Sequence, residues 1–167
     1  ADVGPPDDRD HGEQLVVLVG EDREVVDVEA EGGERGGAGH LVVAAGGGGI
    51  PVTRHGHHLK GASAVVDKDR ASAKLAELID ADLLIILTAV GKVAIHFGKP
   101  EQQWLDRLSI DDAKRYLAEG QFAVGSMRPK VEAALAFAES RPGRKTLITM
   151  LTKAKEGIEG RTGTIVG

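Results

Sequence analysis

From residue 41 onward, short runs of apolar residues alternate with segments in which apolar residues recur every three or four positions. The runs predict buried strands, and the recurring positions predict amphipathic helices. The predicted strands span 41–45, 83–87 and 146–150, and the predicted helices span 70–79, 110–119 and 130–139. Strands that alternate with helices predict an α/β fold, with a mostly parallel sheet covered on both faces. Ligands of such sheets bind at the carboxyl ends of the strands.

Weaker patterns predict further elements after residue 41. Alternating apolar residues at 93–97 predict a short exposed strand or a hairpin arm. Trp104 lies close in sequence to Leu105 and Leu108, and this group is expected to pack a helix against the sheet. A short helix is expected at 153–158 and a last strand at 164–166.

The predicted helices carry recognisable start and stop residues. Ser109 is expected to be an N-cap, with Asp112 three positions later, and Gly120 closes the same helix. Pro129 is expected to be the first residue of its helix, where the missing N–H is tolerated.

The first forty residues differ in character from the remainder. They hold twelve acidic and three basic residues, and glycines make up half of 31–39, which argues against a helix there. Apolar residues at 15–19 and 25–26 could form strands. Two explanations stay open for this segment: a shifted reading frame and a disordered acidic lead. We therefore divide the chain into 1–40, a glycine-rich lead, and 41–167, the α/β unit.

Composition excludes several classes of protein. The formal net charge is -5 and the pI is about 5.7, which argues against a nucleic-acid partner. The chain has no cysteine, so disulfides and thiolate metal sites are excluded. No apolar run is long enough to span a membrane and no signal-peptide pattern is present, so a cytoplasmic protein is expected. The start at Ala1 suggests a fragment or a processed start.

Three segments carry candidate chemistry. Gly46, Gly47, Gly48 and Gly49 follow a predicted strand, and their backbone amides could surround an anion; the alternative is a flexible turn before Pro51. The other two segments, 67–69 and 126–130, contain charged residues.

Asp67, Lys68 and Asp69 lie where an apolar run gives way to a helix. A lysine held between two carboxylates suits a phosphoryl group in transfer, and Asp67 could cap the helix. The alternative for this segment is an exposed helix start with mixed charges.

Ser126, Met127 and Lys130 lie at the start of another predicted helix. Free backbone amides and a lysine in the first turn would favour a nucleotide phosphate; the alternative is an ordinary helix that begins with proline. His55, His57 and His58 form a cluster in a predicted loop without a nearby carboxylate, so we expect no metal site there.

Five segments in this order resemble carbamate kinase, a member of the amino-acid kinase family. They are residues 44–51, 65–72, 97–100, 125–133 and 160–165. The resemblance implies a three-layer α/β/α sandwich, with 41–167 as the nucleotide-binding half of an amino-acid kinase-like domain. It also implies that the chain is truncated, because no first Gly-rich loop and no protruding subdomain with a second catalytic lysine are visible in the sequence. The sandwich would then be incomplete at its N-terminal side.

The resemblance implies a role for each candidate residue. Lys68, Asp69 and Lys130 would be catalytic, with Asp69 orienting the lysines, and the four glycines at 46–49 would face carbamoyl phosphate. The implied nucleotide-binding residues are Asp67, Thr88, Ser126, Met127 and Lys130.

The implied reaction transfers a phosphoryl group from carbamoyl phosphate to ADP and forms ATP and carbamate. Mg²⁺ would accompany the nucleotide, the protein would be a homodimer, and its place would be arginine metabolism. The chain departs from the family pattern at Ala89, Gly91 and Ala94, where two acidic residues and an aromatic residue are usual. These departures predict weakened nucleotide binding and impaired activity. The alternative is a non-catalytic remnant that acts as a binding or oligomerisation module.

Overall fold

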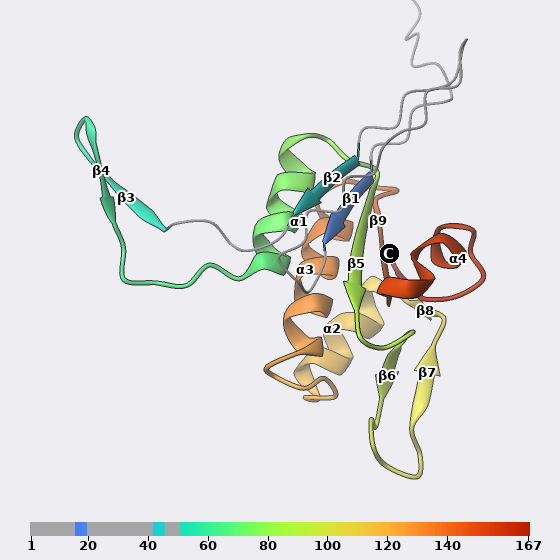
Figure 1. Ribbon diagram of the computed structural model, residues 1–167. Helices are drawn as coiled ribbons and strands as arrows, with labels where there is room; N and C mark the ends of the chain where they lie inside the picture. The colour runs from blue at the N-terminus through green and yellow to red at the C-terminus, as the bar shows by residue number, and fades with distance from the viewer. Residues whose placement is uncertain (1–15, 20–41, 46–50) are drawn as a thin grey trace, which may run out of the picture.

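A six-stranded sheet with the strand order β2–β1–β5–β9–β10–β8 forms the centre of the fold. The computed structural model describes residues 16–19, 42–45 and 51–167 (Figure 1). β1, β2, β5 and β9 are parallel, and β10 runs antiparallel to β9. The bounds are β1 Val16–Val19, β2 Val42–Ala45, β5 Leu83–Thr88, β8 Arg107–Leu108, β9 Lys145–Met150 and β10 Thr164–Val166. The prediction of an α/β fold with a mostly parallel sheet is confirmed.

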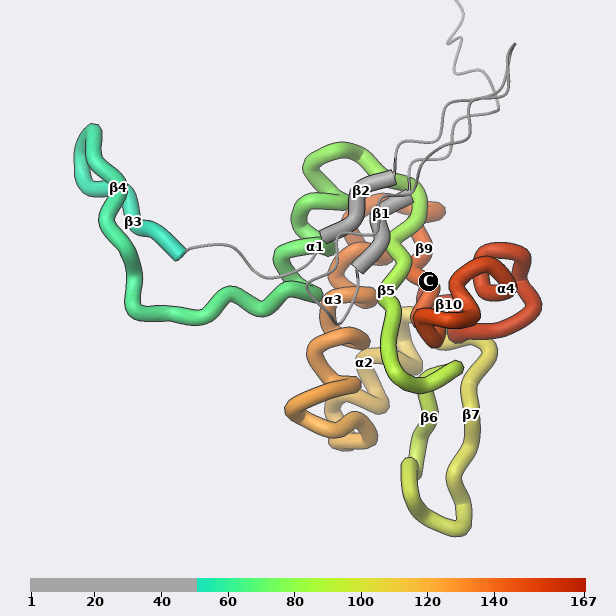
Figure 2. Tube along the Cα trace, in the orientation of Figure 1, coloured from blue at the N-terminus to red at the C-terminus, as the bar shows by residue number. Residues whose placement is uncertain are grey.

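Helices lie on both faces of this sheet. Side chains of a strand point alternately to its two faces. Leu84 and Ile86 of β5 belong to the larger core, which holds apolar residues of α1 (Lys68–Leu78), α2 (Ile110–Ala118) and α3 (Met127–Glu139). Ile85 and Leu87 face a smaller core with Ala154 of α4 (Ala154–Ile158), which follows the short 3-10 helix η1 (Leu151–Lys153). Figure 2 shows α4 on the other side of β5 from α1 and α3.

Two hairpins extend from this body (Figure 1). β3 (Val52–His55) and β4 (His58–Gly61) pair through a turn at Gly56, which has a φ of 60°, and every residue of both strands is exposed. β6 (Val93–Ile95) pairs with β7 (Gln103–Leu105) beyond the carboxyl end of β5.

The β6–β7 hairpin corrects two expectations. The hairpin arm predicted at 93–97 is present, but Val93, Ala94 and Ile95 are buried rather than exposed. Trp104 lies on a strand and is 47% exposed, so it packs no helix against the sheet. The spacing of Trp104, Leu105 and Leu108 is typical of a helix. The structure instead divides these residues between β7 and β8, two short strands that belong to different sheets.

Helix starts agree with the sequence in two cases and differ in one. The N–H of Arg70 donates to Asp67 Oδ1 at 2.9 Å, and that of Asp112 donates to Ser109 Oγ at 3.1 Å, so both predicted caps are confirmed. Helix α3 begins at Met127, so Pro129 is its third residue and not its first. The first turn tolerates proline there because its N–H groups have no partner within the helix.

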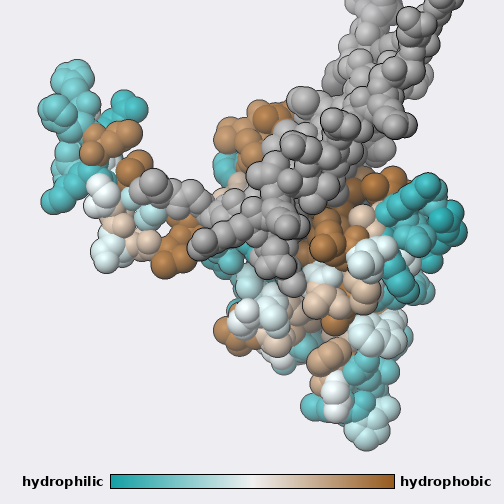
Figure 3. Space-filling view, viewed as in Figure 1, coloured by the Kyte–Doolittle hydropathy of each residue, from teal (hydrophilic) through white to brown (hydrophobic). Residues whose placement is uncertain are grey.

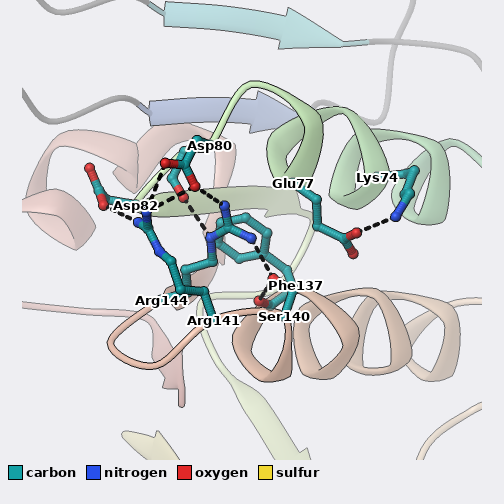
Figure 4. A network of polar contacts seen from close by, with 9 residues as sticks. Lys74, Glu77, Asp80, Asp82, Phe137, Ser140, Arg141 and Arg144 are labelled. Carbon is teal, nitrogen blue, oxygen red and sulfur yellow. Dashed lines mark hydrogen bonds and ion pairs between the residues drawn. The ribbon is translucent and has the colours of Figure 1, made fainter.

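An ionic cluster fixes the end of the sheet opposite to the carboxyl end of β5 (Figure 4). Arg141, just after α3, donates to Asp80 at 2.8 Å and to Asp82 at 2.5 Å. Arg144 is buried, donates to Asp80 at 2.7 Å and to the carbonyl of Ala81 at 3.0 Å, and its guanidinium lies 5.0 Å from the ring centre of Phe137. These contacts hold the end of α3 against the start of β5.

Several predictions concern residues outside the described ranges. They are the glycine loop at 46–49, the strand at 25–26, and the glycine-rich segment 31–39. The strand predicted at 15–19 corresponds to β1.

Candidate functional site

Two helix N-termini meet at the carboxyl end of β5. β5 ends at Thr88, and its arrow in Figure 1 points toward the end at which α3 begins. A short connection joins helix α3 to β9, and β9 is parallel to β5. The N-terminus of α3 therefore lies at the carboxyl end of these strands. Helix α1, which precedes β5, is arranged in the same way. Partial positive charges of two helices therefore face one region.

A buried ion pair connects the two helix starts. Lys130 Nζ, in the first turns of α3, lies 3.3 Å from Asp69 Oδ2 and 3.5 Å from Oδ1. Both side chains are 5% exposed. Burial raises the pKa of Asp69, and the nearby ammonium of Lys130 partly offsets that rise. The structure therefore brings together Asp69 and Lys130, two of the candidate residues, although 61 positions separate them.

Asp67 and Lys68 complete the start of α1. The Asp67 carboxylate is exposed and accepts the N–H of Arg70, which is the capping role expected for it. Lys68 is the first residue of the helix and is half-buried. The nucleotide contact predicted for Asp67 and the catalytic role predicted for Lys68 stay predictions.

A second ionic contact, made by Glu132, lies beside this pair, and the sequence did not predict it. Glu132 of α3 accepts hydrogen bonds from Arg128 at 2.8 Å and from Arg70 of α1 at 2.5 Å. These two bonds, that of Arg128 first, lower the pKa of Glu132. The i, i+4 spacing of Arg128 and Glu132 was visible in the sequence, but the contact with Arg70 depends on how the two helices pack.

Replacing Glu132 by glutamine is expected to lower the free energy of unfolding at pH 7 by less than about 1 kcal/mol, because Arg70 and Arg128 are 66% and 42% exposed. A lowered native pKa stabilises the fold above the ordinary value of 4.5 and loses that effect as the pH falls through the native value. The difference between the two proteins should therefore shrink in acid. Urea unfolding at pH 7 and at pH 3 measures it, and a difference equal at both pH values would contradict this assignment.

A cavity of about 390 Å³ adjoins the start of α3. Thr88, Ser126 and Met127 line it, so three of the predicted nucleotide-binding residues face one space. Ala89 and Ala94, two positions at which the chain departs from the family pattern, line it as well. The other lining residues were not among the predicted site residues, although Phe97 belongs to segment 97–100; they are Val90, Lys92, Phe97, Gln121, Phe122 and Ala123.

The polar groups near this cavity are mostly engaged. Gln121 Oε1 accepts the N–H of His96 at 3.2 Å, which holds the loop after α2 against the β6–β7 hairpin. Lys92 forms an ion pair with Asp106. Most of the other lining residues are apolar, and Lys130 follows Met127 by about one turn of α3.

A larger hollow of about 460 Å³ lies between the outer faces of α1 and α3. Its floor includes Ala73, Ala133 and Ala136, and its rim includes Arg70 and Glu132. Its lining contains none of the predicted site residues, so we place the candidate site at the smaller cavity.

The described residues hold no group of three or more histidine, aspartate or glutamate side chains that could bind a metal ion. His55, His57 and His58 lie on the exposed β3–β4 hairpin, away from the cavity. Figure 3 shows both hydrophilic and hydrophobic residues on this hairpin. Leu59, one of its apolar residues, is 66% exposed. In the part of the chain that the structure describes, no helix is long and apolar enough to cross a membrane.

Known proteins resemble this chain over most of its length. The profile of the amino acid kinase family matches residues 10–149. The carbamate kinase-like protein YqeA of Escherichia coli is 70% identical over 129 residues, and the carbamate kinase of Clostridium perfringens is 49% identical over 127 residues. These alignments cover 77% and 76% of this chain, and 42% and 40% of the relatives.

Solved structures agree with the sequence comparison. The carbamate kinase of Giardia lamblia bound to AMP-PNP has a TM-score of 0.70 with this chain at 37% identity, and covers 76% of it. The match extends over 40% of that structure, so the chain spans about two fifths of the length of the relatives it matches. The chain belongs to the amino acid kinase family and is similar within it to the carbamate kinases.

Proposed function

We propose that this chain is the nucleotide-binding part of a carbamate kinase-like phosphotransferase, which forms ATP and carbamate from ADP and carbamoyl phosphate. The observation that carries the proposal is the buried pair of Asp69 and Lys130, which joins the starts of α1 and α3, together with the cavity that Ser126 and Met127 of α3 line. A buried cation beside a helix N-terminus suits phosphate oxygens, because both supply positive charge where little water competes.

In this reaction the bond between phosphorus and the acyl oxygen of carbamoyl phosphate breaks, and carbamate leaves with the electron pair. A β-phosphate oxygen of ADP forms the new bond to phosphorus. Protein side chains supply position and charge rather than a covalent intermediate. Lys130 and Lys68 would neutralise charge on the transferring group. Asp69 is a positioning residue, since it holds Lys130 from the neighbouring helix.

Other partners of the reaction follow from the sequence. We propose that Gly46, Gly47, Gly48 and Gly49 face the acyl phosphate, that Thr88 contacts the nucleoside part of ADP in the cavity, and that Ser126 and Met127 contact its phosphates. We propose that Mg²⁺ arrives on the nucleotide phosphates, and we assign it no protein ligand. The homodimer, the cytoplasmic location and a place in arginine metabolism stay predictions.

The test is ATP formation by the purified chain from ADP, Mg²⁺ and carbamoyl phosphate. The Lys68→Ala protein is expected to lose activity by about 10²–10³-fold, the cost of removing one charge-stabilising group. Lys74→Ala is the matched control, because Lys74 lies on the same helix with its side chain 66% exposed and pairs with Glu77. If the chain is folded by circular dichroism but forms no ATP at millimolar ADP, the catalytic proposal is wrong. The chain would then be a non-catalytic remnant.

A further inference from the structure

The β6–β7 hairpin pairs a tryptophan with a residue of the cavity lining. Ala94 of β6 lines the cavity and is 6% exposed, and its direct partner across the antiparallel ladder is Trp104 of β7. Directly paired residues project from the same face of a two-stranded sheet. Trp104 therefore lies on the same face of the hairpin as Ala94.

A phenylalanine joins this indole to the cavity. Phe97 lines the cavity, and its ring meets Trp104 edge to face, with ring centres 6.1 Å apart and planes at 76°. Both rings keep large open surfaces, since Phe97 is 61% and Trp104 is 47% exposed. An edge-to-face pair orients each ring, so the open faces are held in place rather than free to rotate.

The start of α3 also lines the cavity. Ser126 and Met127 line the cavity and are the N-cap and first residue of that helix, and Lys130 follows one turn later. A ligand that fills the cavity with a planar ring can therefore place an anionic group at the helix start. Nucleotides have this combination of a ring and phosphates.

We propose that Phe97 and Trp104 form an aromatic wall that contacts the base of the bound nucleotide. The inference rests on the proposed function for the identity of the ligand and adds the residues that hold its base. A base stacks on or packs against aromatic rings, and such contacts tolerate a lining with few hydrogen-bonding groups. The aromatic surface that the chain lacks at Ala94 is supplied from the position directly across the ladder.

Tryptophan fluorescence tests the wall directly, because Trp104 is the one tryptophan of the chain. Titration with ADP is expected to change the emission with saturation, whereas pyrophosphate, which lacks a base, is expected to leave it unchanged. Equal responses to ADP and pyrophosphate would overturn the proposal, since they would report the phosphates alone. ADP binding in calorimetry without any change in emission would overturn it too.

Variants separate contact with the base from general effects. Phe97→Leu and Trp104→Leu are each expected to weaken ADP binding by about tenfold and to leave pyrophosphate binding unchanged. Leu59→Ala is the matched control, because Leu59 is 66% exposed on the other hairpin and should change neither affinity. Both aromatic side chains are well exposed, so their replacement should leave the fold intact, which circular dichroism checks.

The outcomes distinguish this inference from the proposed function. Base-dependent fluorescence without ATP formation would support the wall and contradict the phosphotransferase. ATP formation with the same KM for ADP in wild type, Phe97→Leu and Trp104→Leu would support the phosphotransferase and overturn the wall. A chain that binds no ADP by either method would overturn the wall.

Discussion

Lys130→Met is expected to be the most damaging single change at the site, because it removes a proposed phosphate-binding charge and the partner of a buried carboxylate. Asp69 would keep its burial but lose the cation 3.3 Å away. Breaking a buried pair by removing one partner costs about 3–5 kcal/mol, and we expect the free energy of unfolding at pH 7 to fall by about that amount. ATP formation should fall to background.

The pH dependence of this variant follows from the sign of the Asp69 shift. Burial raises the pKa of Asp69, and loss of Lys130 removes an influence that lowers it, so the native pKa should rise further. A carboxyl whose native pKa is raised makes the fold less stable as the pH rises from the ordinary value of 3.8 through the native value. The deficit of Lys130→Met should therefore shrink toward acidic pH, as Asp69 takes up a proton.

A double variant separates stability from chemistry. Lys130→Met with Asp69→Leu replaces both members by apolar side chains, which should recover much of the lost stability but none of the activity. Lys74→Met is the control, since its exposed pair on α1 should contribute at most about 0.5 kcal/mol. Urea unfolding at pH 7 and at pH 5 measures all three proteins. A Lys130→Met protein as stable as wild type at both pH values would contradict the assigned role of the pair.

Local signals in the sequence predicted the elements of this fold well. The predicted strand at 83–87 and helix at 70–79 appear as β5 (Leu83–Thr88) and α1 (Lys68–Leu78), because their periodicity and caps lie within the segments themselves. The helix at 153–158 appears in two parts, η1 and α4. The prediction for Trp104 was wrong because Trp104, Leu105 and Leu108 have helical spacing, and spacing alone does not show that they belong to two different strands.

The candidate site was predictable only in part. Lys130 and Thr88 stood out by charge type or by position after a strand. Phe97 and Gln121 did not, since they reach the cavity through the bend of the β6–β7 hairpin and the loop after α2. Such contacts depend on tertiary packing between segments far apart in the chain, and no local pattern encodes them.

The loop before β10 contains a glycine whose backbone conformation and close neighbours leave little room for a side chain. Gly163 has a φ of 92°, and a Cβ there would lie 2.5 Å from Leu147 Cδ1 and 3.1 Å from the carbonyl oxygen of Ile148. Close approach of this glycine to β9 sets up Thr164, whose hydroxyl accepts the N–H of Val93 at 2.8 Å and donates to the carbonyl of Leu105 at 2.5 Å. The glycine therefore also supports the hairpin that carries the aromatic wall.

Gly163→Ala is expected to lower the free energy of unfolding by about 2–5 kcal/mol, the sum of an unfavourable left-handed backbone and overpacking against β9. Gly160→Ala is the matched control, because Gly160 has a φ of 75° but no atom within 4 Å of the added Cβ. It should lose about 1–2 kcal/mol, the backbone part alone. Urea unfolding with m-values compared across the three proteins measures both losses. Equal losses in the two variants would mean that β9 yields to the new methyl group, and that backbone conformation alone requires glycine at position 163.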